Sequence, residues 1–183
     1  EQLPCLMMDR DFSALSACEE SNDIETIKRE REQQLVSLVK SLAPDIFLIE
    51  LYPFGRKAFS FELVPAIEAA KSLESCKVVC SLRDILVEKQ KQETYEERVV
   101  KILNRFFDGV LVHSDPLLLP LTRTFNSVDK IDVPLLYTGF VARKEKFDPD
   151  NPVRNQLGIG DNEILVVASA GSGAVGYHLL NAI

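Results

Sequence analysis

The sequence lacks the features that mark membrane-spanning, secreted and nucleic-acid-binding proteins. No apolar run approaches the roughly 20 residues that a helix needs to cross a bilayer, and no basic segment followed by an apolar stretch opens the chain as a signal peptide would. The formal net charge is -7, and the basic residues form no stripe that could neutralise a run of phosphates. We therefore expect a cytoplasmic protein that has no integral membrane segment and binds no nucleic acid.

Cysteine and histidine are also scarce, with four cysteines and two histidines. Cys5 and Cys18 stand alone in the sequence, whereas Cys76 and Cys80 flank a strand-like segment that holds them about 13 Å apart. That distance is too long for a disulfide or a shared metal ion. Neither histidine has a cysteine or carboxylate at the spacing of metal ligands. The sequence therefore predicts reduced cysteines and no metal site.

What the chain does contain is a globular composition and an alternation of strand-like and helix-like segments. It has 183 residues, of which 46% are hydrophobic and 27% charged, enough to bury a core. Alternating strands and helices are typical of a parallel sheet with crossover helices, so the predicted fold class is α/β with a Rossmann-like sheet. The chain starts at Glu1, without methionine, and stops at Ile183 within an apolar helical pattern, so we expect a fragment cut at both ends.

The expected elements follow from apolar periodicity and from capping and breaking residues. Short apolar runs predict strands over 46–51, 77–82, 109–113, 133–137 and 163–169. Asn22 and Glu25 form a capping pair that predicts a helix start, and Pro44 predicts the end of that helix. Thr94 and Glu97 form a second capping pair. Further helices are expected over 59–70, 114–121 and 174–183.

Each of the first four predicted strands runs into polar or loop residues. In an open parallel sheet, ligands bind outside the carboxyl ends of the strands, because loops and helix N-termini converge there. The residues at these ends are Glu50, Phe54, Gly55, Arg56, Ser81, Arg83, Asp84, His113, Ser114, Asp115, Tyr137, Thr138 and Gly139. A structural role is open for the same residues. Ser114 and Asp115 can cap a helix, while Arg83 and Asp84 can form ion pairs.

A glycine-rich turn forms the second candidate site. Residues 170–176 read Ala-Gly-Ser-Gly-Ala-Val-Gly between a predicted strand and a predicted helix. A turn without Cβ atoms lets backbone N–H groups approach an oxyanion, and the helix dipole favours negative charge there. A diphosphate at Gly171, Ser172 and Gly173 fits this pattern, and so does close packing of the glycines. No Walker lysine is present.

Four motifs in order resemble a family of predicted bacterial glycosyltransferases. They occupy residues 44–56, 81–86, 107–116 and 137–141, so the resemblance covers nearly all of the chain from residue 44 onward. The family is similar to the GT-B enzymes, among them the N-acetylglucosamine transferase of peptidoglycan synthesis. The resemblance thus implies two Rossmann-like domains that face each other across a cleft.

In that family, the chain would be part of a metal-independent enzyme that moves a sugar from a nucleotide-sugar donor to an unknown acceptor. The implied organisation is a partial acceptor-side domain over 1–140, an interdomain linker over 141–162 and the start of a donor-binding domain over 163–183. The family carries a glycine-histidine turn after its first strand, and none occurs before residue 44. We therefore expect this chain to be inactive alone.

The resemblance also implies roles for individual residues. The donor diphosphate would lie at Gly171, Ser172 and Gly173, and no cofactor is expected besides the donor substrate. The candidates for the general base are Asp84, Glu50 and His113. The acceptor-side cleft would contain Phe54, Gly55, Arg56, Arg83, Ser114, Asp115, Tyr137 and Gly139.

Two other functions are compatible with the same residues. A sugar-nucleotide epimerase or hydrolase of GT-B shape would use the same donor turn with carboxylate chemistry in the cleft. A non-catalytic α/β binding module would present the strand-end groups to a protein or a small ligand. Sheet edges left open at the cut ends would expose apolar surface and could pair with a second copy of the chain, giving a homodimer.

Overall fold

The computed structural model describes residues 2–8, 15–18, 23–83, 86–142, 153–160 and 162–168. Contacts between Cα atoms divide the chain into two compact units, Glu1–Ala142 and Arg143–Ile183. We describe each unit by itself. The predicted division into an acceptor-side domain, a linker and a donor-binding domain stays a prediction.

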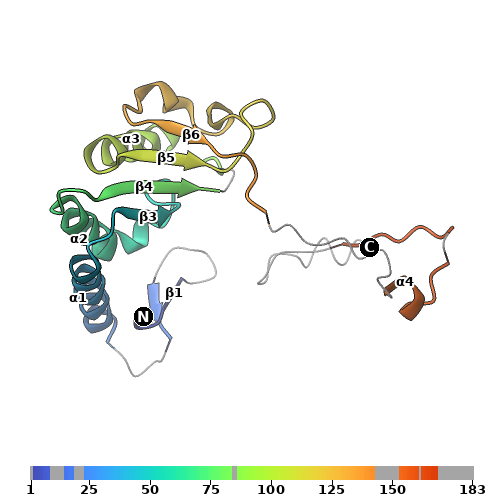
Figure 1. Cartoon of the computed structure of the whole chain (residues 1–183), viewed down its shortest axis with the longest axis horizontal. Coiled ribbons are helices and arrows are strands. Elements are labelled where there is room, and N and C mark those ends of the chain that lie inside the picture. The colour runs from blue at the N-terminus through green and yellow to red at the C-terminus, as the bar shows by residue number, and fades with distance from the viewer. Residues whose placement is uncertain are drawn as a thin grey trace. The chain divides into compact units, whose positions relative to one another are not determined.

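The first unit is built on a parallel sheet of four strands (Figure 1). The strands lie in the order β3-β4-β5-β6. Their bounds are Ile46–Glu50 for β3, Lys77–Leu82 for β4, Gly109–Val112 for β5 and Leu135–Tyr137 for β6. The predicted fold class is therefore confirmed: the chain has a partial Rossmann-like α/β fold.

Helices connect the strands and form the other layer of this unit. Helix α1 spans Ile24–Leu42, α2 spans Ser60–Lys71 and α3 spans Gln92–Phe106. Short 3-10 turns cover Lys57–Phe59 (η1), Leu121–Arg123 (η2) and Asn126–Lys130 (η3). The core lies between the helices and the sheet, where Ala66, Ile67, Val78, Cys80, Val99, Leu103 and Val110 are completely buried.

The two faces of the sheet differ in burial. Side chains alternate between faces along a strand, and in β4 the residues Val78, Cys80 and Leu82 are buried against the helices while Ser81 is half-buried on the opposite face. On that opposite face Leu48 and Leu136 are 53% and 56% exposed. Polar residues at its carboxyl edge are thus reachable from solvent.

Two predicted helix starts are wrong. The side chain of Asp23, rather than Asn22, caps α1: its Oδ2 accepts hydrogen bonds from Thr26 N at 3.0 Å and from Thr26 Oγ1 at 2.8 Å. These bonds hold the pKa of Asp23 below its usual value. Helix α3 begins two residues before Thr94, at Gln92, whose Oε1 accepts from Lys89 N at 2.9 Å in the segment that precedes the helix.

The helix predicted over 114–121 does not form. Ser114 Oγ donates to the carbonyl of Leu119 at 2.9 Å, so it does not accept from a helix N–H. Asp115 Oδ1 accepts from Leu117 N at 2.8 Å within a turn. Pro120 lacks the N–H that would continue a helix. The segment is a compact turn that leads into η2.

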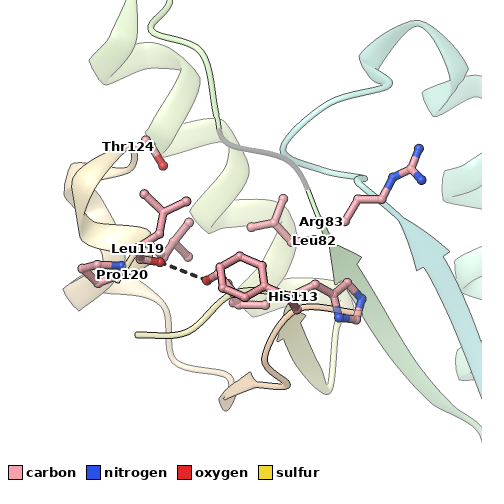
Figure 2. Close-up of a pocket in the computed structure, with 10 residues that line it drawn as sticks. Leu82, Arg83, His113, Leu119, Pro120 and Thr124 are labelled. Carbon is pink, nitrogen blue, oxygen red and sulfur yellow. Dashed lines mark hydrogen bonds between the residues drawn. The ribbon is translucent and has the colours of Figure 1, made fainter. Parts of the chain in front are cut away.

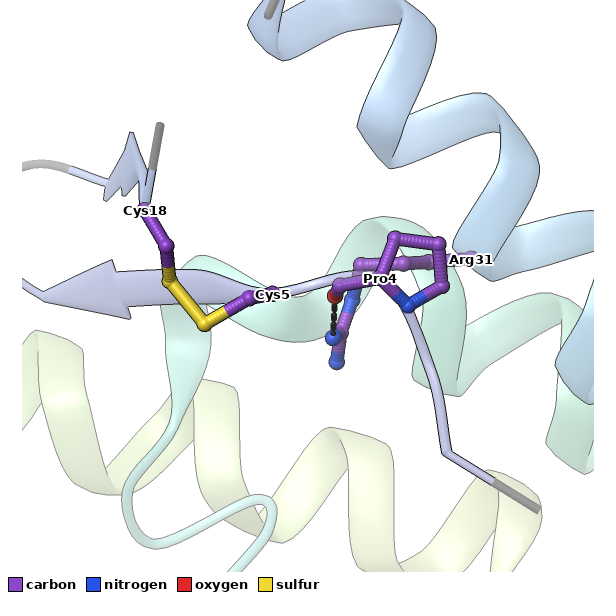
Figure 3. The surroundings of a disulfide bond; sticks show 4 residues. All are labelled: Pro4, Cys5, Cys18 and Arg31. Atoms are coloured by element: carbon purple, nitrogen blue, oxygen red, sulfur yellow. Dashed lines mark hydrogen bonds between the residues drawn. A yellow bond between two sulfur atoms is a disulfide. The ribbon is translucent and has the colours of Figure 1, made fainter. Parts of the chain in front are cut away.

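The prediction that all cysteines are reduced is also wrong, because Cys5 and Cys18 form a disulfide (Figure 3). The strands β1 (Leu6–Met8) and β2 (Leu15–Ala17) pair antiparallel, with Leu6 opposite Ala17. Cys5 precedes one partner and Cys18 follows the other, which brings their Cα atoms to 5.6 Å. The guanidinium of Arg31 donates to the carbonyl of Pro4 beside the bridge. Cys76 and Cys80 are free, as predicted, and they are buried.

In the second unit, the described residues contradict one predicted element, the strand over 163–169. A short helix, α4 (Val153–Gln156), lies within the predicted linker. Residues 162–168 form no strand, although an apolar strand was predicted over 163–169. A strand needs a hydrogen-bonded neighbour, and the described residues provide none here, so Ile164 and Val166 stay 91% and 77% exposed. The predicted turn over 170–176 and helix over 174–183 lie outside the described residues.

Among the described residues, no helix is long and apolar enough to span a bilayer.

Candidate functional site

Polar side chains from neighbouring strands meet at the carboxyl edge of the sheet. His113 follows β5 and makes two side-chain hydrogen bonds. Its Nε2 lies 2.8 Å from Ser81 Oγ on β4, and its Nδ1 lies 2.6 Å from Thr138 Oγ1 after β6. The parallel register produces this cluster, because it sets Ser81 beside Leu111 and brings the residues that follow β5 and β6 to the same edge.

The hydrogen bonds of Thr138 are compatible with one tautomer of His113. The Thr138 hydroxyl has one hydrogen, and its Oγ1 lies 3.1 Å from the carbonyl oxygen of Gly139 and 3.5 Å from that of Val112. When the hydroxyl donates to Gly139, it accepts from His113 Nδ1–H, and the Nε2 lone pair accepts from the Ser81 hydroxyl. In this tautomer Nε2 is a base that points to a hydroxyl.

A second network at the same edge consists of charged residues. Glu50, the last residue of β3, accepts from Arg56 through Oε2 at 2.6 Å and from Arg83 through Oε1 at 2.7 Å. Glu50 is the register partner of Ser81. Both oxygens of Glu50 therefore bind guanidinium groups.

A cavity of about 190 Å³ opens beside His113 (Figure 2). Its lining residues are Leu82, Arg83, Val112, His113, Ser114, Leu119, Pro120, Leu121, Thr124 and Phe140. In Figure 2, Arg83 and His113 lie at one side of the cavity and Leu119, Pro120 and Thr124 at the other. The cavity thus combines an apolar wall with an imidazole and a guanidinium.

The remaining predicted cleft residues are placed differently. Ser114 is 7% exposed and, with Asp115, stabilises the turn after β5, so neither residue caps a helix as the structural alternative for this pair expected. Tyr137 lies on the helix-covered face opposite Val112, where its hydroxyl accepts from Leu121 N at 2.9 Å. Gly139 has φ +73°, a backbone conformation that favours glycine.

Phe54 and Gly55 lie in the loop after β3. Phe54 is 2% exposed and packs edge-on against Phe125 with ring centroids 5.3 Å apart. Gly55 is constrained by space, because a Cβ there would lie 2.8 Å from the Leu51 side chain. This loop is therefore well packed.

Several candidates lie outside the described residues: Asp84, and Gly171, Ser172 and Gly173 of the predicted glycine-rich turn. Conversely, Ser81 and Thr138 were noticed only as strand-end residues, and their contacts with His113 were missed. The two-residue alternation along each strand could have shown that all of these side chains belong to one face. No cluster of three or more His, Cys, Asp or Glu that could hold a metal occurs among the described residues.

Comparison with known proteins identifies no family. No protein-family model matches the chain, and no curated protein matches it. A solved structure of a morphinone reductase mutant in complex with tetrahydroNAD is similar at a TM-score of 0.33 and 13% identity. The match covers 85% of this chain, which spans 57% of the length of that structure.

Proposed function

We propose that the protein is a glycosyltransferase that moves a sugar from a nucleotide-sugar donor to the hydroxyl group of an acceptor, and that His113 is its general base. The observation that carries the proposal is the hydrogen-bonded row of Ser81, His113 and Thr138 at the carboxyl edge of an open parallel sheet. Such edges bind ligands in open α/β sheets. The four motifs that resemble predicted glycosyltransferases give the reaction class.

The proposed step transfers one proton and exchanges one bond. An acceptor hydroxyl that donates to Ser81 Oγ passes its proton through Ser81 to His113 Nε2. The acceptor oxygen then bonds to the anomeric carbon of the donor, while the bond from that carbon to the phosphate oxygen breaks and the nucleoside diphosphate leaves with the electron pair. Thr138 keeps the imidazole in the Nδ1–H form that this step requires.

The partners in this proposal are a nucleotide sugar, with its diphosphate at Gly171, Ser172 and Gly173, and an acceptor of unknown identity. A homodimer is a further proposal. It is supported by β3, which in the described sheet pairs on one side only and leaves Ile46 63% exposed. Sedimentation velocity over a hundredfold range of protein concentration tests for the dimer. A protein that stays monomeric over the whole range would contradict this proposal.

A cytoplasmic location also remains a proposal, and the Cys5–Cys18 disulfide is the observation against it. Reducing compartments keep most thiols reduced. Alkylation of intact cells before lysis, followed by mass spectrometry of the peptides, decides between free thiols and a bridge.

The experiment for the transferase function uses the full-length protein in two stages. A thermal-shift screen against UDP, GDP, dTDP and their sugars identifies the donor, since a bound ligand raises the melting temperature. Transfer or hydrolysis of that donor is then measured for His113→Asn, Ser81→Ala and, as a control on the exposed face of α1, Ser37→Ala. We expect kcat to fall about 10²- to 10⁴-fold for His113→Asn with little change in donor KM.

The two stages fail in different ways. If no nucleotide or nucleotide sugar raises the melting temperature at millimolar concentration, the transferase function is rejected. If a donor binds and His113→Asn keeps its kcat, the base is another residue.

The contact between Ser81 and His113 favours one alternative. A serine hydroxyl 2.8 Å from an imidazole nitrogen is also the geometry of a nucleophile and its base. A hydrolase of this type would be labelled at Ser81 by a fluorophosphonate, whereas the transferase would not.

A further inference from the structure

A wide groove lies between the loop after β3 and the first turns of α3. It has a volume of about 1050 Å³, compared with about 190 Å³ for the cavity beside His113. Its lining residues are Leu51, Phe54, Gly55, Arg56, Lys57, Ala58, Phe59, Lys89, Lys91, Thr94, Tyr95 and Arg98. A volume of this order holds an organic ligand.

The charge of the groove is opposite to that of the chain. Five of its lining residues are basic and none is acidic, although the chain carries a formal net charge of -7. Lys57, Lys89 and Lys91 form no ion pair with any described residue. Their ammonium groups are therefore available to an anion, and like charges held near one another favour a ligand with more than one negative charge.

The walls of the groove are fixed by hydrogen bonds between its two sides. Tyr95 Oη, on α3, donates to the carbonyl of Phe54 at 2.9 Å, and Arg98 NH2 donates to the carbonyl of Pro53 at 3.1 Å. Burial raises the pKa of Tyr95 to about 12, so its hydroxyl keeps the proton that it donates. The guanidinium of Arg98 also lies 5.8 Å from the centre of the Tyr95 ring. The groove is therefore formed before any ligand binds.

The floor of the groove is apolar. Leu51, Phe54, Ala58, Phe59 and Tyr95 line it between the basic side chains. Phe54 and Tyr95 both pack edge-on against Phe125, at 5.3 and 6.2 Å between ring centroids. A ligand that fits this surface combines anionic groups with an apolar part.

We infer that the groove binds a phosphate-bearing organic ligand, with its phosphate groups at Lys57, Lys89 and Lys91 and its apolar part on Phe59 and Tyr95. Phosphate groups match this chemistry because they carry up to two charges each and accept several hydrogen bonds from ammonium and guanidinium groups. The site goes beyond the proposed transferase function and does not depend on it.

The test measures binding of inorganic pyrophosphate by isothermal titration calorimetry. The groove variant carries Lys57→Gln, Lys89→Gln and Lys91→Gln, and the matched control carries Lys40→Gln, Lys101→Gln and Lys130→Gln, which remove the same charge from exposed lysines elsewhere. All six side chains are exposed, so both variants are expected to fold, and circular dichroism verifies this.

We expect the groove variant to bind pyrophosphate about 30-fold more weakly than the wild type, which corresponds to roughly threefold per lysine. The affinity of the control variant should stay within about a factor of three of the wild-type affinity. Wild-type affinity should also fall as sodium chloride rises from 50 to 300 mM. Equal affinity of wild type and groove variant, or no detectable binding, overturns the inference. Neither result depends on donor turnover, so failure of this site and failure of the transferase function are distinguishable.

A second pair of probes separates the two sources of such a ligand. Methyl phosphate represents soluble phosphate esters, and dodecyl phosphate below its critical micelle concentration represents lipid-linked phosphates. If dodecyl phosphate binds at least tenfold more tightly than methyl phosphate, and Phe59→Ser removes this difference, the groove is assigned to lipid-linked phosphates. Equal affinity assigns it to soluble esters. Binding of either probe that is unchanged in the lysine variant overturns the site.

Discussion

Replacement of Glu96 by alanine should destabilise the protein by roughly 2–6 kcal/mol. Glu96, on α3, is 2% exposed. Its carboxylate accepts from the backbone N–H groups of Asn126 and Ser127, each at 2.8 Å, and from Gln92 Nε2 at 2.7 Å. Alanine leaves both backbone N–H groups without this acceptor, at roughly 1–3 kcal/mol each. The bonds also hold η3, which packs against η2 and thus against the wall of the cavity beside His113.

Urea unfolding at pH 7 measures this effect. The midpoint should fall while the denaturant slope stays constant, because the same surface is exposed. Glu97→Ala is the matched control: it removes a carboxylate from the next, exposed position of α3 and should change stability by less than about 0.5 kcal/mol. Glu96→Gln keeps one acceptor oxygen, so its loss of stability should lie between those of Glu96→Ala and Glu97→Ala. If Glu96→Ala and Glu97→Ala unfold within 0.5 kcal/mol of each other, the reasoning is refuted.

The same residue predicts a pH dependence. Burial alone would raise the pKa of Glu96, but the hydrogen bonds from Asn126, Gln92 and Ser127 outweigh it and hold the pKa below its ordinary value. A carboxyl whose folded pKa is lowered contributes stability above its unfolded pKa, about 4.3, and loses it as pH falls through the folded value. The difference between wild type and Glu96→Ala should therefore be full at pH 7 and shrink below about pH 4. A difference that grows in acid would contradict this sign.

Two further predictions concern the cysteines. Reduction of Cys5–Cys18, which are 13 residues apart in sequence, should lower the free energy of unfolding by about 3 kcal/mol, because the open chain gains entropy. Urea curves with and without a phosphine reductant measure this, and identical curves would mean that the bridge does not constrain the unfolded chain. Burial raises the pKa of Cys80 to about 12, so iodoacetamide at pH 8 should label it only in urea. Labelling of Cys80 in the native protein, seen by peptide mass spectrometry, would show that the core opens.

The sheet was predictable from sequence because its determinants are local. Residues 78–82 are mostly apolar and lie between Lys77 and Arg83, and β4 forms over the predicted residues Lys77–Leu82. Helix α1 ends just before Pro44, as expected, with Ala43 in the left-handed conformation at φ 42°. In both cases the deciding residues lie within a few positions of the element.

Two of the errors involve a partner that is distant in sequence or absent. Cys18 meets Cys5 because a hairpin pairs them, which spacing alone does not reveal. Glu96, for which the sequence analysis made no prediction, likewise has its backbone partners 30 and 31 residues away. The apolar run from Ile164 to Val167 has the composition of a strand but no neighbour in the described structure. The sequence predicted that Ser81, His113 and Thr138 lie at strand ends, because strand ends are local features. It did not predict their hydrogen bonds with one another, because these depend on how the strands pair.

Glu50 connects the strand-end network to the basic groove. Arg56, held at φ 55°, lines the groove and donates to Glu50 Oε2 at 2.6 Å, while Arg83 donates to the other oxygen. An anion in the groove competes with Glu50 for Arg56. Removal of that carboxylate in Glu50→Gln should therefore raise the affinity for pyrophosphate about two- to fivefold, the range of an exposed ion pair. Calorimetry beside Glu68→Gln, an exposed carboxylate on α2, measures the change. Weaker binding by Glu50→Gln would show instead that Glu50 holds Arg56 in the orientation that binds the anion.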